Sequence, residues 1–166
     1  MESDNKLYES IKYSNIDLIL SVPCKMLEGL INLINLKDEI RHIPITREEE
    51  GIGIAAGAFL GGRNPAILMQ NSGIGNSINA IKSLLEIYEI SVVLFMSHRG
   101  AEGEKISAQI PMGEITFPLL NCIGMNFLTI DSVQKVDLIS DFILKHRKLN
   151  ESVAIVLEKS LWRTSK

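Results

Sequence analysis

Residues 66–77 read AILMQNSGIGNS, an apolar run that passes directly into a turn of small and polar residues. The run at 66–70 does not alternate apolar and polar positions, which is typical of a strand buried on both faces of a sheet. After the turn the apolar residues follow helical spacing, at Ile78, Ile81, Leu85 and Tyr88. The stretch therefore predicts a buried strand, a tight turn and a helix.

Short apolar or β-branched runs recur along the rest of the chain, at residues 16–22, 42–45, 91–97, 126–130 and 153–157. Segments with helical spacing separate most of them, for example at Val133, Val136, Ile139 and Ile143. Strands that alternate with helices are typical of parallel sheets covered on both faces. The sequence predicts an α/β fold with a mostly parallel six-stranded sheet and helices on both faces.

The composition favours one domain, residues 1–166, that binds a small molecule or another protein. A formal net charge of -3 argues against nucleic acid or an anionic membrane as the main partner. Cys24 and Cys122 lie far apart without a CxxC motif, so we expect reduced thiols and no metal site on this chain. The acidic N-terminus and the lack of an apolar run near ~20 residues predict a cytoplasmic protein.

Ligands of such sheets bind beyond the carboxyl ends of the strands, here residues 22–24, 45–47, 70–75 and 97–100. The turn at 71–77 has two readings: its amides bind an anion beside a helix N-terminus, or it is only a tight connection. The stretch 99–113 is expected to be a long irregular loop, of the kind that forms lids or binding loops.

Residues 47–57, REEEGIGIAAG, place three carboxylates before a glycine pattern. Thr46 and Glu49 have the spacing of a helix capping box. Glu48 continues an apolar helix stripe, whereas Glu50 lies beside a strip of glycines, at Gly53, Gly57 and Gly61. A dinucleotide loop fits poorly because the acids would repel phosphate. The triplet is either an ordinary acidic helix start or a site in which Glu48 is the carboxylate drawn out of bulk water.

Four strings carry a resemblance that covers nearly the whole chain: SVPCKMLEGLI, TREEEGIGIAAGAFLGG, NPAILMQNSGIGNSINAI and HRGAEGEKISAQIPMGEIT. They resemble the pyrimidine-binding domain of thiamine diphosphate enzymes, and more narrowly the sulfopyruvate and phosphonopyruvate decarboxylases. In that family a glutamate nine residues before the glycine of an AAG-like element pairs with the cofactor's aminopyrimidine ring, and Gly57 places it at Glu48. The resemblance implies the same fold, a catalytic role for Glu48, and cofactor contacts from the SGIGN turn, at Ser72, Gly73, Ile74, Gly75 and Asn76.

The family's diphosphate-binding domain carries a Gly-Asp-Gly element that binds magnesium, and this sequence contains none. The resemblance therefore implies a beta subunit that supplies that domain and Mg²⁺, in a hetero-oligomer. Length and lack of fusion are most like the alpha subunits of sulfopyruvate decarboxylases. The implied reaction converts 3-sulfopyruvate to sulfoacetaldehyde and CO2 in coenzyme M biosynthesis. The alternatives are a half-site for phosphonopyruvate or another 2-oxo acid, and a non-catalytic interaction domain of the same fold.

A doubly anionic 2-oxo acid requires cations or hydrogen-bond donors at the strand ends. The candidate substrate-binding residues are Pro23, Cys24, Asn71, His98, Arg99, Lys105 and Gln109. Each has an ordinary alternative, as a solvated loop charge or a side chain that stabilises a turn. Ile110 stands where the phosphonopyruvate enzymes often have histidine, which disfavours the phosphonate substrate.

Overall fold

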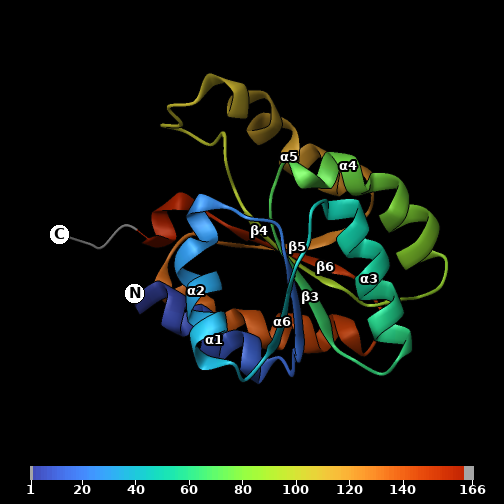
Figure 1. The fold of residues 1–166 in the computed structure, drawn as a ribbon. Coiled ribbons are helices and arrows are strands. Elements are labelled where there is room, and N and C mark those ends of the chain that lie inside the picture. The colour runs from blue at the N-terminus through green and yellow to red at the C-terminus, as the bar shows by residue number, and fades with distance from the viewer. Residues whose placement is uncertain (1, 163–166) are drawn as a thin grey trace.

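The computed structural model describes residues 2–162 and contains one parallel sheet (Figure 1). Its strands are β1 (Leu18–Ser21), β2 (Arg41–Pro44), β3 (Pro65–Gln70), β4 (Val93–Ser97), β5 (Asn126–Ile130) and β6 (Val153–Leu157). They lie in the order β2-β1-β3-β4-β6-β5, and every neighbouring pair is parallel. The predicted six-stranded α/β sheet is confirmed.

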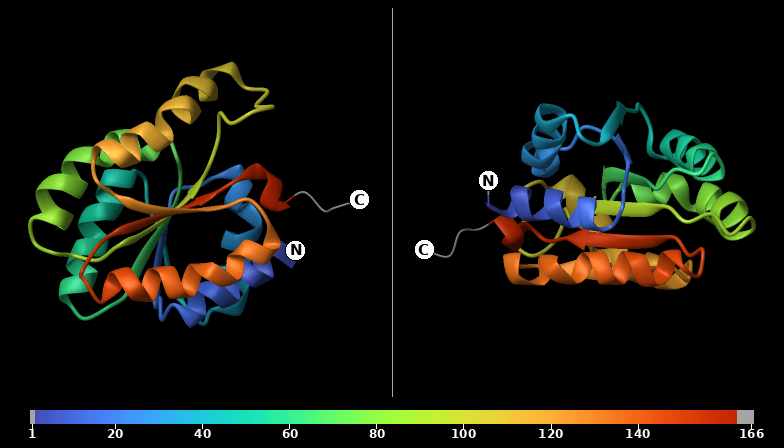
Figure 2. Two further views of the ribbon diagram at one scale, coloured as in Figure 1. Left: turned by 180° about the vertical axis from the view of Figure 1, so that it is seen from behind. Right: turned by 90° about the horizontal axis from the view of Figure 1, so that it is seen from below.

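Helices cover both faces of this sheet, as two further views show (Figure 2). One face carries α1 (Glu2–Tyr13), α2 (Glu28–Lys37) and α6 (Leu138–Arg147), and the other carries α3 (Glu48–Leu60), α4 (Gly73–Ala80) and α5 (Ile110–Cys122). Phe95 of β4 packs into the first core and its neighbour Leu94 into the second. Both side chains are fully buried, which explains why the strands read as continuous apolar runs. Within residues 2–162 we find no helix long and apolar enough to cross a bilayer.

The carboxyl ends of the strands meet at one edge of the sheet, where the chain changes direction. The strand β2 lies on one side of β1 and β3 on the other. The helices that follow β1 and β2, α2 and α3, therefore lie on opposite faces. Such a switch point opens a crevice at the strand ends, which is where ligands bind in open α/β sheets.

The irregular stretch after β4 is shorter than expected. A 3₁₀ turn at Ser107–Gln109 leads directly into α5, which begins at Ile110. Pro111 lies in the first turn, where its fixed φ and missing N–H favour a helix start. The predicted loop at 99–113 is therefore wrong in its second half, and only residues up to 106 lie outside a helix.

Candidate active site

The acidic triplet forms the first turn of α3, with Arg47 as the N-cap residue. The amide and hydroxyl of Thr46 both donate to Glu50 Oε2, at 3.2 and 2.7 Å, and these bonds lower the pKa of Glu50. Arg47 Nε donates to Glu49 Oε1 at 2.6 Å, while Glu49 Oε2 is buried without a partner in residues 2–162. The predicted Thr46–Glu49 capping box is wrong: the helix begins at Glu48, so it is Glu50 that reaches back to Thr46.

Glu48 differs from the other two carboxylates because it has no hydrogen-bond or ion-pair partner among the described residues. Its side chain is half-buried and lies against Gly73, the first residue of α4. A Cβ on Gly73 would stand 2.3 Å from Glu48 Cγ and 2.7 Å from Oε1. Farther along its stripe Ile52 and Ala55 are fully buried, as the helix spacing predicts. The Glu48 carboxylate therefore lies at the start of α4, and its oxygens accept no hydrogen bond from the described residues.

The SGIGN turn is the N-terminal turn of α4. The amides of Ile74 and Gly75 donate to the carbonyls of Asn71 and Ser72, both at 3.2 Å, so these amides are occupied within the turn. Ile74 is fully buried in the α3–α5 core, whereas Gly75 and Asn76 are exposed. Of the two readings of this turn, the hydrogen bonds favour the tight connection over an anion cradle built from its amides.

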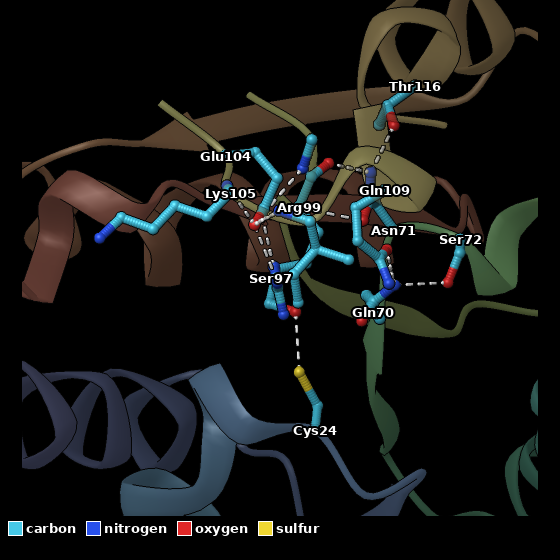
Figure 3. Close-up of polar contacts among 12 residues, drawn as sticks. Cys24, Gln70, Asn71, Ser72, Ser97, Arg99, Glu104, Lys105, Gln109 and Thr116 are labelled. Atoms are coloured by element: carbon cyan, nitrogen blue, oxygen red, sulfur yellow. Dashed lines mark hydrogen bonds and ion pairs between the residues drawn. The ribbon is translucent and has the colours of Figure 1, made fainter. Parts of the chain in front are cut away.

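Gln70 links this turn to the loop that precedes α5. Its Nε2 donates to Ser72 Oγ at 2.8 Å and to Gln109 Oε1 at 2.7 Å, so Ser72 and Gln109 lie on either side of it (Figure 3). The candidate residues from β3 and from the start of α5 are thereby brought together at one edge of the sheet.

Asn71 is fully buried, and its side chain fastens the end of β4 and helix α5 to the end of β3. Its Nδ2 donates to the Arg99 carbonyl at 2.9 Å and to Thr116 Oγ1 at 2.8 Å (Figure 3). Its Oδ1 accepts from the Arg99 amide at 3.1 Å. All of these bonds are internal, so the side chain of Asn71 holds the site together rather than presenting a free donor.

Arg99 is partly buried and is paired with Glu104. Its Nε and Nη2 donate to the two carboxylate oxygens of Glu104 at 2.7 and 3.1 Å, and the side chains are only 16% and 7% exposed. Glu104 also accepts from the amides of Lys105 and Ile106. The guanidinium holds the pKa of Glu104 far below its usual range. Figure 3 shows the Lys105 side chain pointing away from this network.

His98 is also engaged on both sides of its ring. Its Nδ1 lies 2.7 Å from Glu158 Oε1 and its Nε2 lies 3.3 Å from the Gly113 carbonyl. The hydrogen bond to Glu158 raises the pKa of His98, although burial opposes the shift. With 6% of its surface exposed, His98 serves to tie β4 to α5 and to the end of β6.

A cavity of about 400 Å³ opens at the same edge on the α2 side, between the ends of β1 and β2. The candidates Pro23 and Cys24 line it, and Cys24 Sγ lies 3.1 Å from Ser97 Oγ at the end of β4 (Figure 3). Four other lining residues were not predicted as site residues. Lys25 lies at the rim, and the side chains of Ser21, His42 and Asn35 are linked in a chain by hydrogen bonds.

In that chain Ser21 Oγ lies 2.7 Å from His42 Nε2, and His42 Nδ1 lies 2.6 Å from Asn35 Oδ1. The three residues belong to β1, β2 and α2. No short motif could have revealed the chain, because only the parallel pairing of β1 with β2 brings Ser21 beside His42.

Comparisons with known proteins agree with this architecture. No family model matches the chain. It is 46% identical to the sulfopyruvate decarboxylase subunit alpha of Methanococcus maripaludis over 169 residues, which covers 100% of both chains. It is 54% identical to the subunit of that name from Methanocaldococcus jannaschii over 121 residues, 73% of this chain and 72% of that one. A sulfopyruvate decarboxylase of Methanosarcina acetivorans is 32% identical over 98% of this chain but only 41% of its own length.

Among solved structures, the fold is similar to a 2-oxoglutarate:ferredoxin oxidoreductase from Magnetococcus marinus. The TM-score is 0.66, with 96% of this chain and 29% of that chain covered. The identity is 11%, so this likeness concerns the fold alone.

Proposed function

This chain belongs to the family of sulfopyruvate decarboxylase alpha subunits, and we propose that it forms one half of a thiamine diphosphate-dependent active site that decarboxylates 3-sulfopyruvate. The products are sulfoacetaldehyde and CO2, and the step belongs to coenzyme M biosynthesis. The proposal rests on the names of the relatives and on the state of one side chain, Glu48.

The observation that carries the proposal is the unpartnered carboxylate of Glu48. Glu49 and Glu50 each accept a hydrogen bond from a residue just before the helix, whereas the Glu48 carboxylate has no partner in residues 2–162 and packs on the bare Cα of Gly73. A ring nitrogen of an aminopyrimidine accepts a hydrogen bond, and a protonated carboxyl group can donate it. The residues therefore fit the pyrimidine end of the cofactor, with Glu48 as its hydrogen-bond partner and the start of α4 as its wall.

Thiamine diphosphate supplies the electron sink that a 2-oxo acid needs in order to lose CO2. The role of this chain is to place a titratable group. Glu48 Oε1 or Oε2 would hold a proton toward the pyrimidine ring, in a half-buried position where water competes less for it. The hydrogen bonds of Asn71 and Gln70 to other side chains hold the loop before α5, and α5 itself, beside the start of α4, where Glu48 lies.

We propose that a beta subunit binds the diphosphate end of the cofactor and its Mg²⁺. The relatives of similar length are named alpha subunits, while the M. acetivorans protein aligns with this chain over only 41% of its length. A surface suited to close approach of a partner lies on α3, where Gly53, Gly57 and Gly61 are exposed. A Cβ at Gly53 or Gly57 would meet nothing within 4 Å, so another backbone has room to lie along this strip.

The test is decarboxylation by the chain co-expressed with its beta subunit, with sulfopyruvate and phosphonopyruvate as alternative substrates. The Glu48→Gln variant is expected to lose about 10²- to 10⁴-fold in rate, the usual contribution of a positioned acid or base. Glu50→Gln is the matched control, because Glu50 lies in the same helical turn and already accepts hydrogen bonds from Thr46. A Glu48→Gln enzyme within a few-fold of wild type would contradict the assignment, and turnover of phosphonopyruvate alone would contradict the substrate.

A further inference from the structure

The Ser21–His42–Asn35 chain leaves a defined donor at the cavity wall. Asn35 Oδ1 is an acceptor, so the proton of this contact must lie on His42 Nδ1. Burial lowers the pKa of His42, which favours the neutral ring, and the bare Nε2 then accepts from the Ser21 hydroxyl. The oxygen of Asn35 is thereby turned toward His42, and its Nδ2 amide has no partner in the described residues.

The cavity also has a cation that is more readily available than Arg99. The Arg99–Glu104 pair is partly buried, with side chains 16% and 7% exposed, so Arg99 would leave a poorly solvated carboxylate behind if it left its partner. The Lys25–Glu28 pair is at the rim, with side chains 83% and 53% exposed. Water screens such a surface pair and leaves it weak, so Lys25 can exchange Glu28 for another anion.

The cavity and Glu48 belong to the same edge of the sheet. The carbonyl of Ser21 accepts from the Ile45 amide at 2.9 Å, and α3 begins with Glu48 three residues after Ile45. Ser21 lies on the α2 side of the sheet and Glu48 on the α3 side. A cofactor pyrimidine bound at Glu48 and an anion bound in the cavity would therefore lie at the same edge of the sheet.

We propose that the cavity on the α2 side receives the sulfonate of the substrate, with Lys25 and the Asn35 amide as donors and with Ser21 and His42 as positioning residues for Asn35. This inference rests on the proposed function, since the 2-oxo acid end must lie at the cofactor whose pyrimidine ring Glu48 would bind. A sulfonate has three oxygens that only accept hydrogen bonds, which matches a wall that offers an ammonium and an amide N–H. Asn32 lines the same wall and supplies a further amide.

The first test measures binding of isethionate, a sulfonate without a 2-oxo acid, to the co-expressed complex by titration calorimetry. Lys25→Ala and Asn35→Asp are each expected to weaken binding about tenfold or more, as loss of a charge-assisted donor implies. Asn35→Asp keeps an acceptor for His42, removes the amide donor and adds a carboxylate that repels an anion, so both changes weaken binding only if the anion lies beside residue 35. Lys135→Ala is the matched control, because Lys135 is an exposed lysine in a local ion pair with Asp131 and should leave the affinity unchanged.

The second test separates the two ends of the substrate through competitive inhibition of decarboxylation. Both variants, and more weakly Ser21→Ala, should raise the inhibition constant of isethionate and leave that of 2-oxobutyrate, which lacks a sulfonate, within about twofold. An equal effect on both inhibitors would mean a general structural role and would overturn the proposal. So would a wild-type complex that does not bind isethionate.

The two proposals fail separately. Isethionate binding that depends on Lys25, in a complex that does not decarboxylate sulfopyruvate, would refute the proposed function and leave the sulfonate site standing. Decarboxylation of sulfopyruvate with no effect of Lys25→Ala or Asn35→Asp on either measurement would refute the sulfonate site alone.

Discussion

Replacing Gly73 by alanine should damage the site without damaging the fold. Gly73 is the first residue of α4 and has no positive φ, so alanine suits its backbone and is favoured in a helix by roughly 0.5–1 kcal/mol. The added Cβ, however, would lie 2.3 Å from Glu48 Cγ, where ordinary contact begins near 3.4 Å. The Glu48 side chain is flexible and yields, so it must move by about 1 Å.

A misplacement of that size at a reacting group costs up to about 10²-fold in rate. We therefore expect Gly73→Ala to reduce kcat/KM of the complex by about 10- to 100-fold, while urea unfolding of the chain changes by less than about 1 kcal/mol. Gly75→Ala adds the same methyl group to the same turn without displacing Glu48, since its Cβ would meet only Met112 Cε, at 3.9 Å, so it measures the effect of a methyl group in this turn by itself. Decarboxylation and the affinity for thiamine diphosphate are measured for both variants.

Gly73 and Glu48 should also be coupled in their effects on the rate. If Gly73→Ala acts through Glu48, then it should have little additional effect in a Glu48→Gln background, because the two changes disturb the same group. Full additivity of the two losses, or a Gly73→Ala enzyme as active as wild type, would refute the idea that Gly73 is present to make room for Glu48.

Three other predictions concern the framework of the site. Gly100→Ala should destabilise the chain by several kcal/mol in urea unfolding, since φ is +82° and the Cβ would stand 2.1 Å from the Gln109 carbonyl oxygen; unchanged stability would contradict the close contact. The depressed pKa of Glu104 means that its ion pair with Arg99 stabilises the fold above the unfolded pKa of about 4.3 and that this contribution is lost as pH falls. The stability difference between wild type and Glu104→Gln should therefore be constant from pH 8 to 6 and shrink below about pH 4; a difference that grows on acidification would show the sign to be wrong. Asn71→Leu should cost about 2–5 kcal/mol in the same assay, because it leaves the buried Arg99 amide and carbonyl without their partner.

The architecture could be predicted from the sequence because each strand is a short apolar run that must be buried on both faces. The position of Glu48 could also be predicted, since helix periodicity alone places it on the stripe of Ile52 and Ala55. The capping arrangement could not, because a shift of one residue in the helix start exchanges Glu49 for Glu50, and local pattern does not resolve one residue.

The partners of the candidate cations His98 and Arg99 could not be predicted for a different reason. Their partners are set by tertiary structure: His98 meets Glu158, which lies 60 residues away in the sequence. Arg99 meets Glu104, a near neighbour in sequence, but only the fold of the loop turns the two side chains inward. The chain of Ser21, His42 and Asn35 likewise depends on strand register and helix placement.

The contact between Gly100 and Gly113 has a consequence for motion. A Cβ on Gly113 would lie 2.4 Å from the Gly100 carbonyl carbon, so the loop after β4 rests directly on the backbone of α5. Most contacts between a loop and a helix can loosen gradually, as side chains change rotamer one at a time. Two glycines have no rotamers, so this contact is either closed or broken. Any movement of the loop that carries Arg99 must then take the first turns of α5 with it as one body, or separate from them in a single step.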